Sequence, residues 1–383
     1  MYTVETEKVP IKIWASSIED TALEQAKNVA NLDITYHHVA VMADAHQGFG
    51  VPIGGVFAAK DAVVPNAVGV DIGCGMCAVR TNIQESDSKA IKKFLGSIRE
   101  EIPVGFNHRK QPVPWEEFKH PPEIHVIQQE IESAKHQLGT LGGGNHFIEV
   151  QQDQEQRIWL MVHSGSRNFG FKIAKHFHSV AKNWCKAENI SLPTTELAYL
   201  PFDHPQAEKY IEAMNFALAF AFENRMQMMK ILKQEFSSAF KKTEYDEVIN
   251  IHHNYAAKEH HFGEDVVVHR KGATSAQKEQ TGIIPGSQGT HSFIVKGKGN
   301  PESFCSCSHG AGRKMGRKEA QRKLDLSKEQ GFMENQGIIH SIRSKKDLDE
   351  AAGAYKNIQT VMKDQNDLVE ILTELKPLAV IKG

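Results

Sequence analysis

The sequence has no long hydrophobic run, no regular cysteine pattern and little excess charge of either sign. None of its apolar stretches reaches the roughly 18 residues that a membrane-spanning helix needs. Its five cysteines are odd in number and unevenly spread, which argues against a disulfide framework and favours a reducing compartment. The opening segment MYTVETEKVPIKIWA has no apolar core of the signal-peptide kind. We therefore expect a cytoplasmic protein that does not bind a membrane.

The net charge of −2 gives no sign of a general affinity for nucleic acids, although a local basic patch would be enough for binding. The strongest such patch is GRKMGRKEAQRK, residues 312–323, which contains six Lys or Arg residues. The same run also fits a solvated helix face. The chain contains 20 histidines, and histidine is the commonest metal ligand, so the surroundings of each histidine matter more than their number.

The pattern of apolar residues predicts a mixture of helices and strands. The expected helices are residues 16–31, beginning with a serine cap, and residues 86–101, 123–138 and 205–240. Strand-like runs are residues 34–42, 54–64 and 76–83, followed by several between 248 and 310. Residues 103–122 are proline-rich and loop-like, and the tail is expected to hold one or two helices. No linker divides two compositions, so we predict one α+β domain, residues 1–383, with mixed sheets.

The segment DIGCGM places a carboxylate and a thiol three residues apart, with glycines between and around them. Asp71 and Cys74 can therefore point at one centre, and this pair of ligands suits Mn²⁺, Fe²⁺ or Zn²⁺. Cys74 taken alone also fits a buried structural cysteine. Cys74 and Cys77 form a CxxC, but no second CxxC completes a zinc ribbon and the βαβ context of a thioredoxin is missing.

Three further loops carry histidines at the ends of short apolar runs. They are LGGGNHFIEV with His146, MVHSGSRNFG with His163, and NIHHNYA with His252 and His253. Each histidine alone also fits an ordinary core or loop position. Together with Asp71 and Cys74 they supply enough ligands for two metal sites that share one of them.

The stretch CSCSHGAGRK, residues 305–314, surrounds one histidine with small residues. Small residues allow a ligand to approach the backbone closely, so His309 fits a metal ligand, a general base, a nucleophile or an ordinary loop histidine. The loop around it and the stretch GIIPGSQGTHSF, residues 282–293, both resemble backbone cradles for phosphate. Neither is a Walker A motif.

Taken as an ordered set, these motifs are specific. The set is MADAHQGFGVPIGG (42–55), VGVDIGCGM (68–76), GGGNHFIEV (142–150), HSGSRN (163–168), HHNYA (252–256), HRKGAT (269–274), GIIPGSQGT (282–290), SHGAGR (308–313) and a terminal KG. It resembles the RtcB family of GTP-dependent RNA ligases from about residue 37 to the last residue. The resemblance implies a single compact α+β domain with a deep active-site cleft.

The resemblance also implies roles for individual residues. Asp71, Cys74 and His146 would hold one Mn²⁺, and Cys74, His163 and His253 a second, with Cys74 bridging. His309 would be the nucleophile that takes GMP, and Arg167 would contact RNA phosphate. The guanylate would be held by Asn145, His146, Phe147, Ile148, Glu149, His253, Asn254, Pro285, Gly286, Ser287, Gln288, Ser292, His309, Gly310, Ala311, Gly312 and Lys382.

The implied reaction joins RNA 3′-phosphate or 2′,3′-cyclic-phosphate ends to 5′-hydroxyl ends through a His–GMP adduct and an RNA 3′-pp-5′-G end. It would serve RNA repair or tRNA splicing, with GTP, two Mn²⁺ and an archease-like activator as partners. Three local departures from the family pattern are Gln288 for methionine, Gly316 for serine and Ala43 for proline. A dinuclear metal phosphohydrolase and a non-catalytic RNA-binding accessory protein are the two alternatives.

Overall fold

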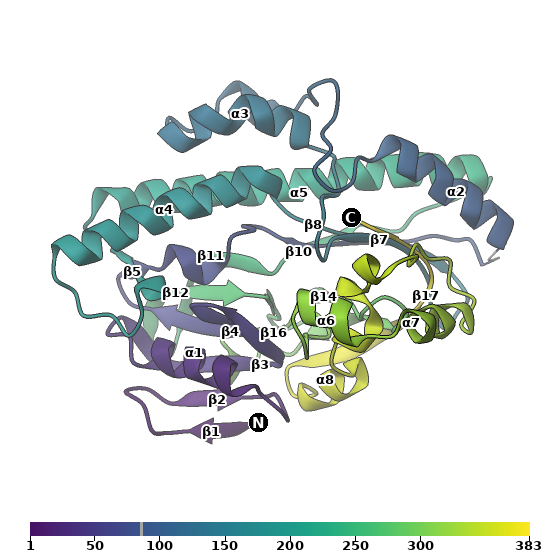
Figure 1. The fold of residues 1–383 in the computed structure, drawn as a ribbon. Helices are drawn as coiled ribbons and strands as arrows, with labels where there is room; N and C mark the ends of the chain where they lie inside the picture. Colours follow the sequence, from purple (N-terminus) through teal and green to yellow (C-terminus); the bar gives the residue numbers. More distant parts are fainter. Residues whose placement is uncertain (85–86) are drawn as a thin grey trace.

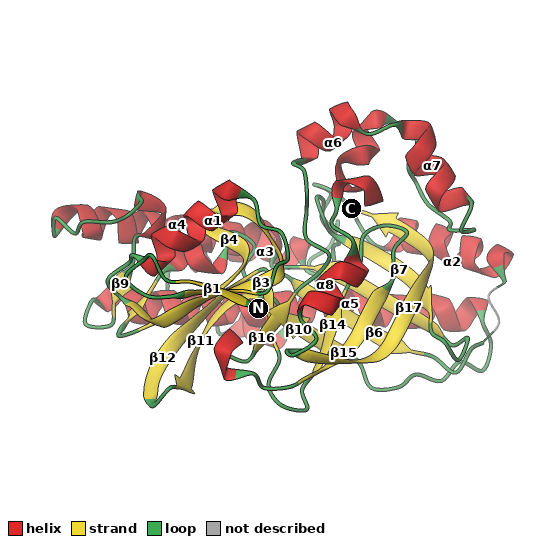
Figure 2. Cartoon of the chain, turned by 90° about the horizontal axis from the view of Figure 1, so that it is seen from below, coloured by secondary structure: helices red, strands yellow, loops and turns green. Residues whose placement is uncertain are grey.

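The protein is described by a computed structural model that covers residues 1–84 and 87–383. Two large sheets lie side by side (Figure 2). The first has six strands in the order β1 (Tyr2–Val4), β2 (Ile11–Ile13), β3 (Thr35–Phe49), β4 (Val51–Ala59), β12 (Glu264–Lys271) and β11 (Asn254–His261). Its neighbouring strands are antiparallel except for the parallel pair β2–β3.

The second sheet has seven strands, and every neighbouring pair in it is antiparallel. Their order is β10 (Ile249–His252), β6 (Gly75–Arg80), β8 (Ile158–Ser164), β7 (Phe147–Gln152), β17 (Val369–Lys382), β15 (Ser292–Gly297) and β14 (Thr281–Ile284). Two short pairs complete the strands of the described residues: β13 (Ala273–Ser275) with β16 (Ser306–Ser308), and β5 (Ala62–Val63) with β9 (Leu200–Pro201).

Eight α-helices are present in the described residues. They are α1 (Asp20–Ala30), α2 (Ser88–Glu101), α3 (His125–Gln137), α4 (Arg167–Ala187), α5 (Pro205–Ala239), α6 (Arg317–Lys323), α7 (Leu326–Glu334) and α8 (Ile358–Asp364). Short 3₁₀ turns are η1 (Pro65–Val68), η2 (Glu116–Lys119), η3 (Thr195–Leu197), η4 (Pro301–Ser303), η5 (Lys345–Glu350) and η6 (Ala352–Ala354). Among the residues that the structure describes, no helix is both long enough and apolar enough to span a bilayer.

The long helix α5 joins the two halves of the core. Proline begins it, and the His204 side chain accepts a hydrogen bond from the N–H of Gln206 at 3.2 Å. Its first half packs against α4 through Tyr210 and Phe220, whereas Leu232 further along packs in the core beneath the seven-stranded sheet. Figure 1 shows α4 and α5 crossing the molecule together above the sheets. Because α5 packs in both parts of the core, it holds the two sheets in position relative to each other.

Most of the expected elements are present, and the differences have local causes. The first helix begins at Asp20 after Glu19, without a side-chain cap, so the predicted serine cap is wrong. The predicted helix 86–101 begins at Ser88, where Asp87 accepts from the N–H of Lys89, and Ser86 lies outside the described residues. The tail holds three helices rather than one or two, and its last segment forms β17. The α+β class with mixed sheets is confirmed.

Candidate metal and nucleotide site

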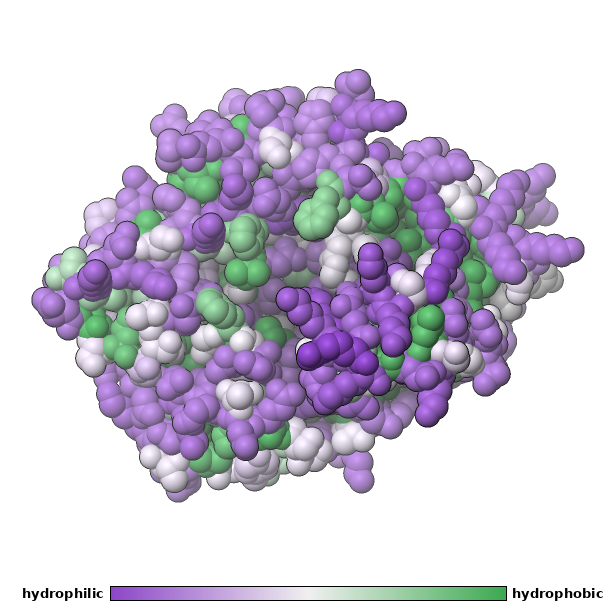
Figure 3. Space-filling view, viewed as in Figure 1, coloured by the Kyte–Doolittle hydropathy of each residue, from purple (hydrophilic) through white to green (hydrophobic). Residues whose placement is uncertain are grey.

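A cavity of about 480 Å³ lies where the two large sheets meet, and a hollow is visible near the centre of the face shown in Figure 3. The first sheet contributes Phe49 at the end of β3 and Lys271 at the end of β12, and the second sheet contributes His163 and Lys382. Loops at the strand ends form the remaining walls. A volume in the range of about 300–1,000 Å³ is typical of sites for small molecules and cofactors.

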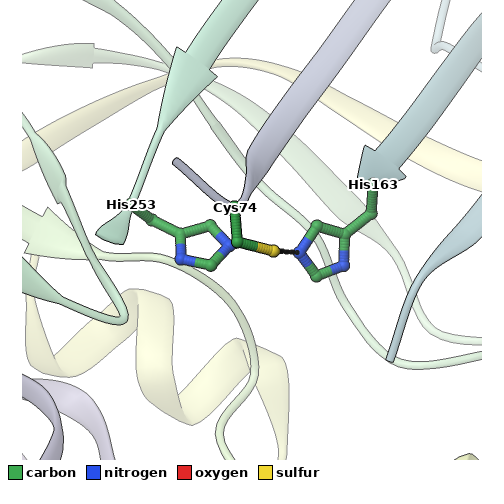
Figure 4. Close-up of side chains that lie close together, drawn as sticks. All are labelled: Cys74, His163 and His253. Carbon is green, nitrogen blue, oxygen red and sulfur yellow. Dashed lines mark hydrogen bonds between the residues drawn. The ribbon is translucent and has the colours of Figure 1, made fainter. Parts of the chain in front are cut away.

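Two overlapping groups of potential metal ligands lie in this cavity, and Cys74 belongs to both. The sulfur of Cys74 lies 3.3 Å from Nε2 of His163, which lies 3.1 Å from Nε2 of His253 (Figure 4). On its other side the sulfur lies 3.4 Å from Nε2 of His146, which lies 3.0 Å from a carboxylate oxygen of Asp71. The structure therefore brings together all five residues that the sequence suggested as metal ligands.

The three imidazoles are oriented by contacts on their far side. Nδ1 of His146 lies 2.9 Å from the carbonyl of Leu141, and Nδ1 of His163 lies 3.0 Å from the carbonyl of Asn145. Nδ1 of His253 lies 3.3 Å from the side-chain oxygen of Asn254. Each Nδ1 is therefore placed to donate its hydrogen to an oxygen, which leaves Nε2 of each ring to bind a metal in the ligand group. This is the arrangement that fixes the tautomer of metal-binding histidines.

The electrostatics of the group fit a site that is completed by a cation. Burial lowers the pKa values of His163 and His253 well below the ordinary value, so both rings stay neutral. Burial raises the pKa of Cys74, and the Asp71 charge raises it further, so the thiol keeps its proton unless a metal replaces it. For Asp71, burial acts to raise the pKa, but His146 and Arg167 outweigh it and hold the carboxyl ionised.

Arg225, fully buried on α5, holds three of the strand ends that carry these ligands. Its guanidinium donates to the carbonyls of Gly73 and Ser164 at 2.8 and 2.9 Å, next to Cys74 and His163. It also donates to Asn250 at 2.7 Å and contacts Nδ1 of His252 at 3.1 Å. Every polar group of this buried cation therefore acts on the ligand loops.

Asn224, one residue earlier on α5, holds the remaining segment, which leads to His146, and it also contacts the residue after Ser164. Its Oδ1 accepts from the N–H groups of Gly139 and Thr140 at 2.7 and 3.1 Å, and its Nδ2 donates to the carbonyl of Gly165 at 3.0 Å. Sequence analysis missed Asn224 and Arg225. The signal that could have found them is two adjacent polar residues in a helix that is otherwise rich in apolar residues. Polar side chains are buried in such a helix only where their polar groups form hydrogen bonds.

His309 lies beside this group, with its ring centre 4.7 Å from that of His253. Its Nδ1 lies 2.7 Å from a carboxylate oxygen of Asp44, which is fully buried. The ring N–H is poorly aligned with that oxygen, so the contact is one of charge and proximity rather than a regular hydrogen bond. The same oxygen accepts from the backbone N–H groups of His309 and Gly310 at 3.1 and 3.2 Å.

Asp44 lies in the long strand β3, within the motif MADAHQGFGVPIGG, and the sequence predicted no role for it. Burial acts to raise the pKa of Asp44, but contact with His309 and a contribution from His46 hold it below its usual value. Gly312, at φ 71°, lets the loop after His309 pass close to this strand, since a Cβ there would lie 2.1 Å from the Asp44 carbonyl oxygen. The carboxylate and the loop thus fix the position of His309.

Most of the residues expected to hold the guanylate line the same cavity. They are Asn145, His146, Phe147, His253, Asn254, Pro285, Gly286, Ser287, Gln288, His309, Gly310, Ala311, Gly312 and Lys382. Ile148, Glu149 and Ser292 are not among its lining residues. Ile148 packs in the hydrophobic core, because alternate residues of β7 point to opposite faces.

Glu149 and Ser292 are joined by Gln151, a residue that sequence analysis missed. The side-chain amide of Gln151 donates to Glu149 at 2.6 Å and to the hydroxyl of Ser292 at 2.9 Å. Burial raises the pKa of Glu149 to about 8, so its carboxyl holds a proton at neutral pH. The roles of Glu149 and Ser292 in nucleotide binding stay predictions.

A second cluster, also missed from the sequence, forms another part of the cavity wall. The buried carboxylate of Glu350 accepts from Arg313 at 2.7 Å and from Arg317 at 2.6 Å, and it also contacts the hydroxyl of Tyr355. Charge from the two arginines holds the pKa of Glu350 low, although burial acts to raise it. Lys382 completes this wall and pairs with Asp349 at 2.8 Å.

Arg167 lies behind the cavity rather than in its wall. Its backbone has a φ of 59°, in the left-handed region, at the first residue of α4. Its guanidinium donates to the hydroxyl of Thr140 and to the carbonyl of Gly105, both at 3.3 Å. Its charge acts on Asp71 in the cavity. Contact with RNA phosphate stays a prediction for Arg167.

Residues 25–120 and 115–383 match the family described as tRNA-splicing ligase RtcB. The chain belongs to the RtcB family. It is 38% identical to the RNA-splicing ligase RtcB of Escherichia coli K12, over 99% of this chain and 98% of that protein. It is 31% identical to the tRNA-splicing ligase RtcB of Thermococcus kodakarensis, over 98% of this chain and 95% of that protein. The resemblance expected from the RtcB motifs is therefore confirmed.

Proposed function

We propose that this chain is an RNA ligase that joins 3′-phosphate and 5′-hydroxyl ends with GTP and Mn²⁺. The observation that carries the proposal is the position of His309. The imidazole of His309 belongs to neither of the two groups of potential metal ligands. It lies beside His253, in a loop of small residues, and the buried carboxylate of Asp44 contacts its Nδ1. With Nδ1 held in this way, Nε2 is left as the nucleophilic atom.

In the proposed reaction, Nε2 of His309 attacks the α-phosphorus of GTP. A P–N bond forms, the bond to the pyrophosphate oxygen breaks, and pyrophosphate leaves. An oxygen of the RNA 3′-phosphate then displaces His309 and forms RNA 3′-pp-5′-G. The 5′-hydroxyl of the second RNA end attacks the phosphorus of the RNA 3′-phosphate, and GMP leaves. A 2′,3′-cyclic phosphate is first opened by water to the 3′-phosphate.

The five clustered ligands would hold two Mn²⁺ ions: Asp71, Cys74 and His146 one, and Cys74, His163 and His253 the other. Bound there, the ions would neutralise charge on the phosphates. The chain's own residues place the reactants. The loop of Gly310 and Gly312 brings backbone close to His309, and Lys382 in the cavity wall would donate to the guanine base.

We propose further that residues 1–383 act as one ligase domain in the cytoplasm, in RNA repair or tRNA splicing. An archease-like activator would be a partner of the reaction. A phosphohydrolase would use the metal ligands as well, but it gives no role to the contact between Asp44 and His309.

The test is ligation of RNA with 3′-phosphate and 5′-hydroxyl ends, with Mn²⁺ and GTP each supplied or withheld. We expect a 3′,5′-phosphodiester product only when both are present. Release of inorganic phosphate from the RNA without joining would instead favour the phosphohydrolase.

A further inference from the structure

A group of exposed cations lies beside the cavity, and no step of the proposed reaction uses it. Its members, called here the α6 ridge, are Arg317, Lys318, Arg322 and Lys323 of α6 and Lys345 and Lys346 of η5. In Figure 3 strongly hydrophilic side chains gather beside the hollow, where Figure 1 shows α6. The whole chain has a net charge of −2, so this gathering of one sign is local.

The centre of the ridge consists of Lys318 and Arg322, one helical turn apart. Both are exposed, and both lie on the side of α6 opposite the buried Ala320. Four residues of helix place them about 6 Å apart along the axis. Within the described residues neither cation pairs with a carboxylate, whereas Lys323 pairs with Glu319 at 2.6 Å. The two central charges therefore face solvent without a carboxylate partner among residues 1–84 and 87–383.

The ridge is continuous with the cavity wall. Arg317, at the start of α6, lines the cavity and pairs with Glu350 at 2.6 Å, yet about half of its side chain is exposed at 51%. The side chain of Gln321 donates to the carbonyl of Lys346 at 2.9 Å and so holds α6 against η5. The ridge therefore begins at the cavity wall with Arg317 and continues on α6 with Lys318 and Arg322.

We propose that the α6 ridge binds the sugar–phosphate backbone of the RNA strand whose end enters the cavity. This rests on the proposed function, which makes RNA the substrate. Cations spaced one helical turn apart match successive phosphates of an extended strand. Exposed cations without partners add little to folding stability, but they gain from neutralising phosphates and releasing counterions. Because the ridge offers charge rather than shaped pockets, it would position RNA of any sequence.

The test compares two double variants with the same change of charge. Lys318→Glu with Arg322→Glu reverses the centre of the ridge. Lys89→Glu with Lys93→Glu is the matched control, because these lysines are also exposed, four residues apart on α2, and away from the cavity lining. Binding of a labelled single-stranded RNA with a 3′-phosphate is measured by fluorescence anisotropy at several salt concentrations, without GTP or Mn²⁺.

We expect the ridge variant to bind RNA roughly tenfold more weakly than the wild type. The slope of log K against log salt concentration should also become shallower by about 1.4, because each lost phosphate contact with a single strand removes about 0.7. The control should bind like the wild type. Uptake of label from α-labelled GTP should be the same in all three proteins. Wild-type RNA affinity and salt slope in the ridge variant would overturn the proposal.

Two further outcomes distinguish RNA binding by the ridge from a protein-docking role and from a failure of the proposed function. If the ridge variant binds RNA normally but is no longer stimulated by an acidic activator protein, the ridge is a protein-docking surface and the proposal is wrong. If the wild type takes up no label and joins no RNA, the proposed function fails, while the RNA-binding comparison still reports on the ridge.

Discussion

Asp44 and His309 come from segments 265 residues apart in the chain, and a carboxylate oxygen of Asp44 lies 2.7 Å from Nδ1 of His309. Because Asp44 is fully buried, its charge is poorly screened and acts mainly on this ring and on the loop N–H groups that it accepts from. A carboxylate charge beside Nδ1 favours the neutral tautomer that carries its proton on Nδ1, with the lone pair on Nε2. This is the tautomer that the proposed nucleophile needs.

Replacing Asp44 by Asn should slow the reaction of His309 with GTP. The amide keeps the shape of the carboxylate, but its NH₂ group can face Nδ1 and favour the wrong tautomer. We expect label uptake from α-labelled GTP to slow by on the order of 10²- to 10⁴-fold. Thermal unfolding of the variant serves as the control for folding. An unchanged rate in a folded Asp44→Asn protein would mean that Asp44 does not orient the nucleophile.

Cys74 is shared by both ligand groups, so Cys74→Ala should affect both proposed metals. We expect elemental analysis after dialysis to find Mn²⁺ much reduced at both positions, together with loss of adduct formation. Cys77→Ala is the matched control, since Cys77 is equally buried but packs in the hydrophobic core rather than in the ligand groups. Two tightly bound Mn²⁺ per chain in Cys74→Ala would rule out the bridging role.

Lys382 is held in the cavity wall by β17 and by its pairing with Asp349. If it donates to the guanine base, Lys382→Ala should lower the rate of adduct formation with GTP at limiting nucleotide by roughly 10- to 100-fold. The preference for GTP over ATP should narrow as well. Lys376→Ala, an exposed change on the same strand, is the control. Equal use of GTP by Lys382→Ala and by the control would remove Lys382 from the guanine pocket.

His269 should make the fold sensitive to acid. The ring stacks on Phe57 with centres 4.6 Å apart, its Nε2 accepts from the N–H of Val64 at 3.0 Å, and burial lowers its pKa to about 3. Protonation would turn two donors towards each other, so below about pH 6.5 the unfolded state takes up the proton and the folded state does not. Stability is therefore lost as the pH falls from about 6.5 towards 3.

The change from pH 7 to pH 5 should lower the free energy of unfolding by about 2 kcal/mol through this one ring. Denaturant unfolding at the two pH values should show a smaller loss in His269→Gln than in the wild type. The exposed change His108→Gln is the control and should behave like the wild type. Equal acid losses in His269→Gln and the control would contradict the assignment.

The sequence supplied a carboxylate, a thiol and several histidines at the ends of short apolar runs, enough for two metal sites. The resemblance to the RtcB family then singled out Asp71, Cys74, His146, His163 and His253, and the structure brings these five together. The sequence did not predict Asp44 or Arg225, since their partners are distant in the chain and only the packing of β3 and α5 brings them close. The sequence shows an acid in a strand and an arginine in an apolar helix, but it does not show which residues they contact.

Helix α4 was also missed, although Phe169, Ile173 and Phe177 repeat every four residues and are fully buried. Glu149 lies on the same face of β7 as Phe147, which lines the cavity, but Glu149 itself is not among the lining residues and accepts from Gln151 at 2.6 Å. Its role in nucleotide binding stays a prediction. A motif gives the order of residues, and the direction of each side chain depends on the register of its strand.

The most direct test of the central claim is the covalent adduct on His309. With α-labelled GTP and Mn²⁺, the wild type should form an adduct that is labile in acid and stable in alkali, as a P–N bond is. His309→Ala should bind GTP and Mn²⁺ but take up no label, and it should still join RNA that already carries a 3′-pp-5′-G end. Label uptake by His309→Ala, or a wild-type adduct that survives acid and breaks in alkali, would show that another residue is the nucleophile.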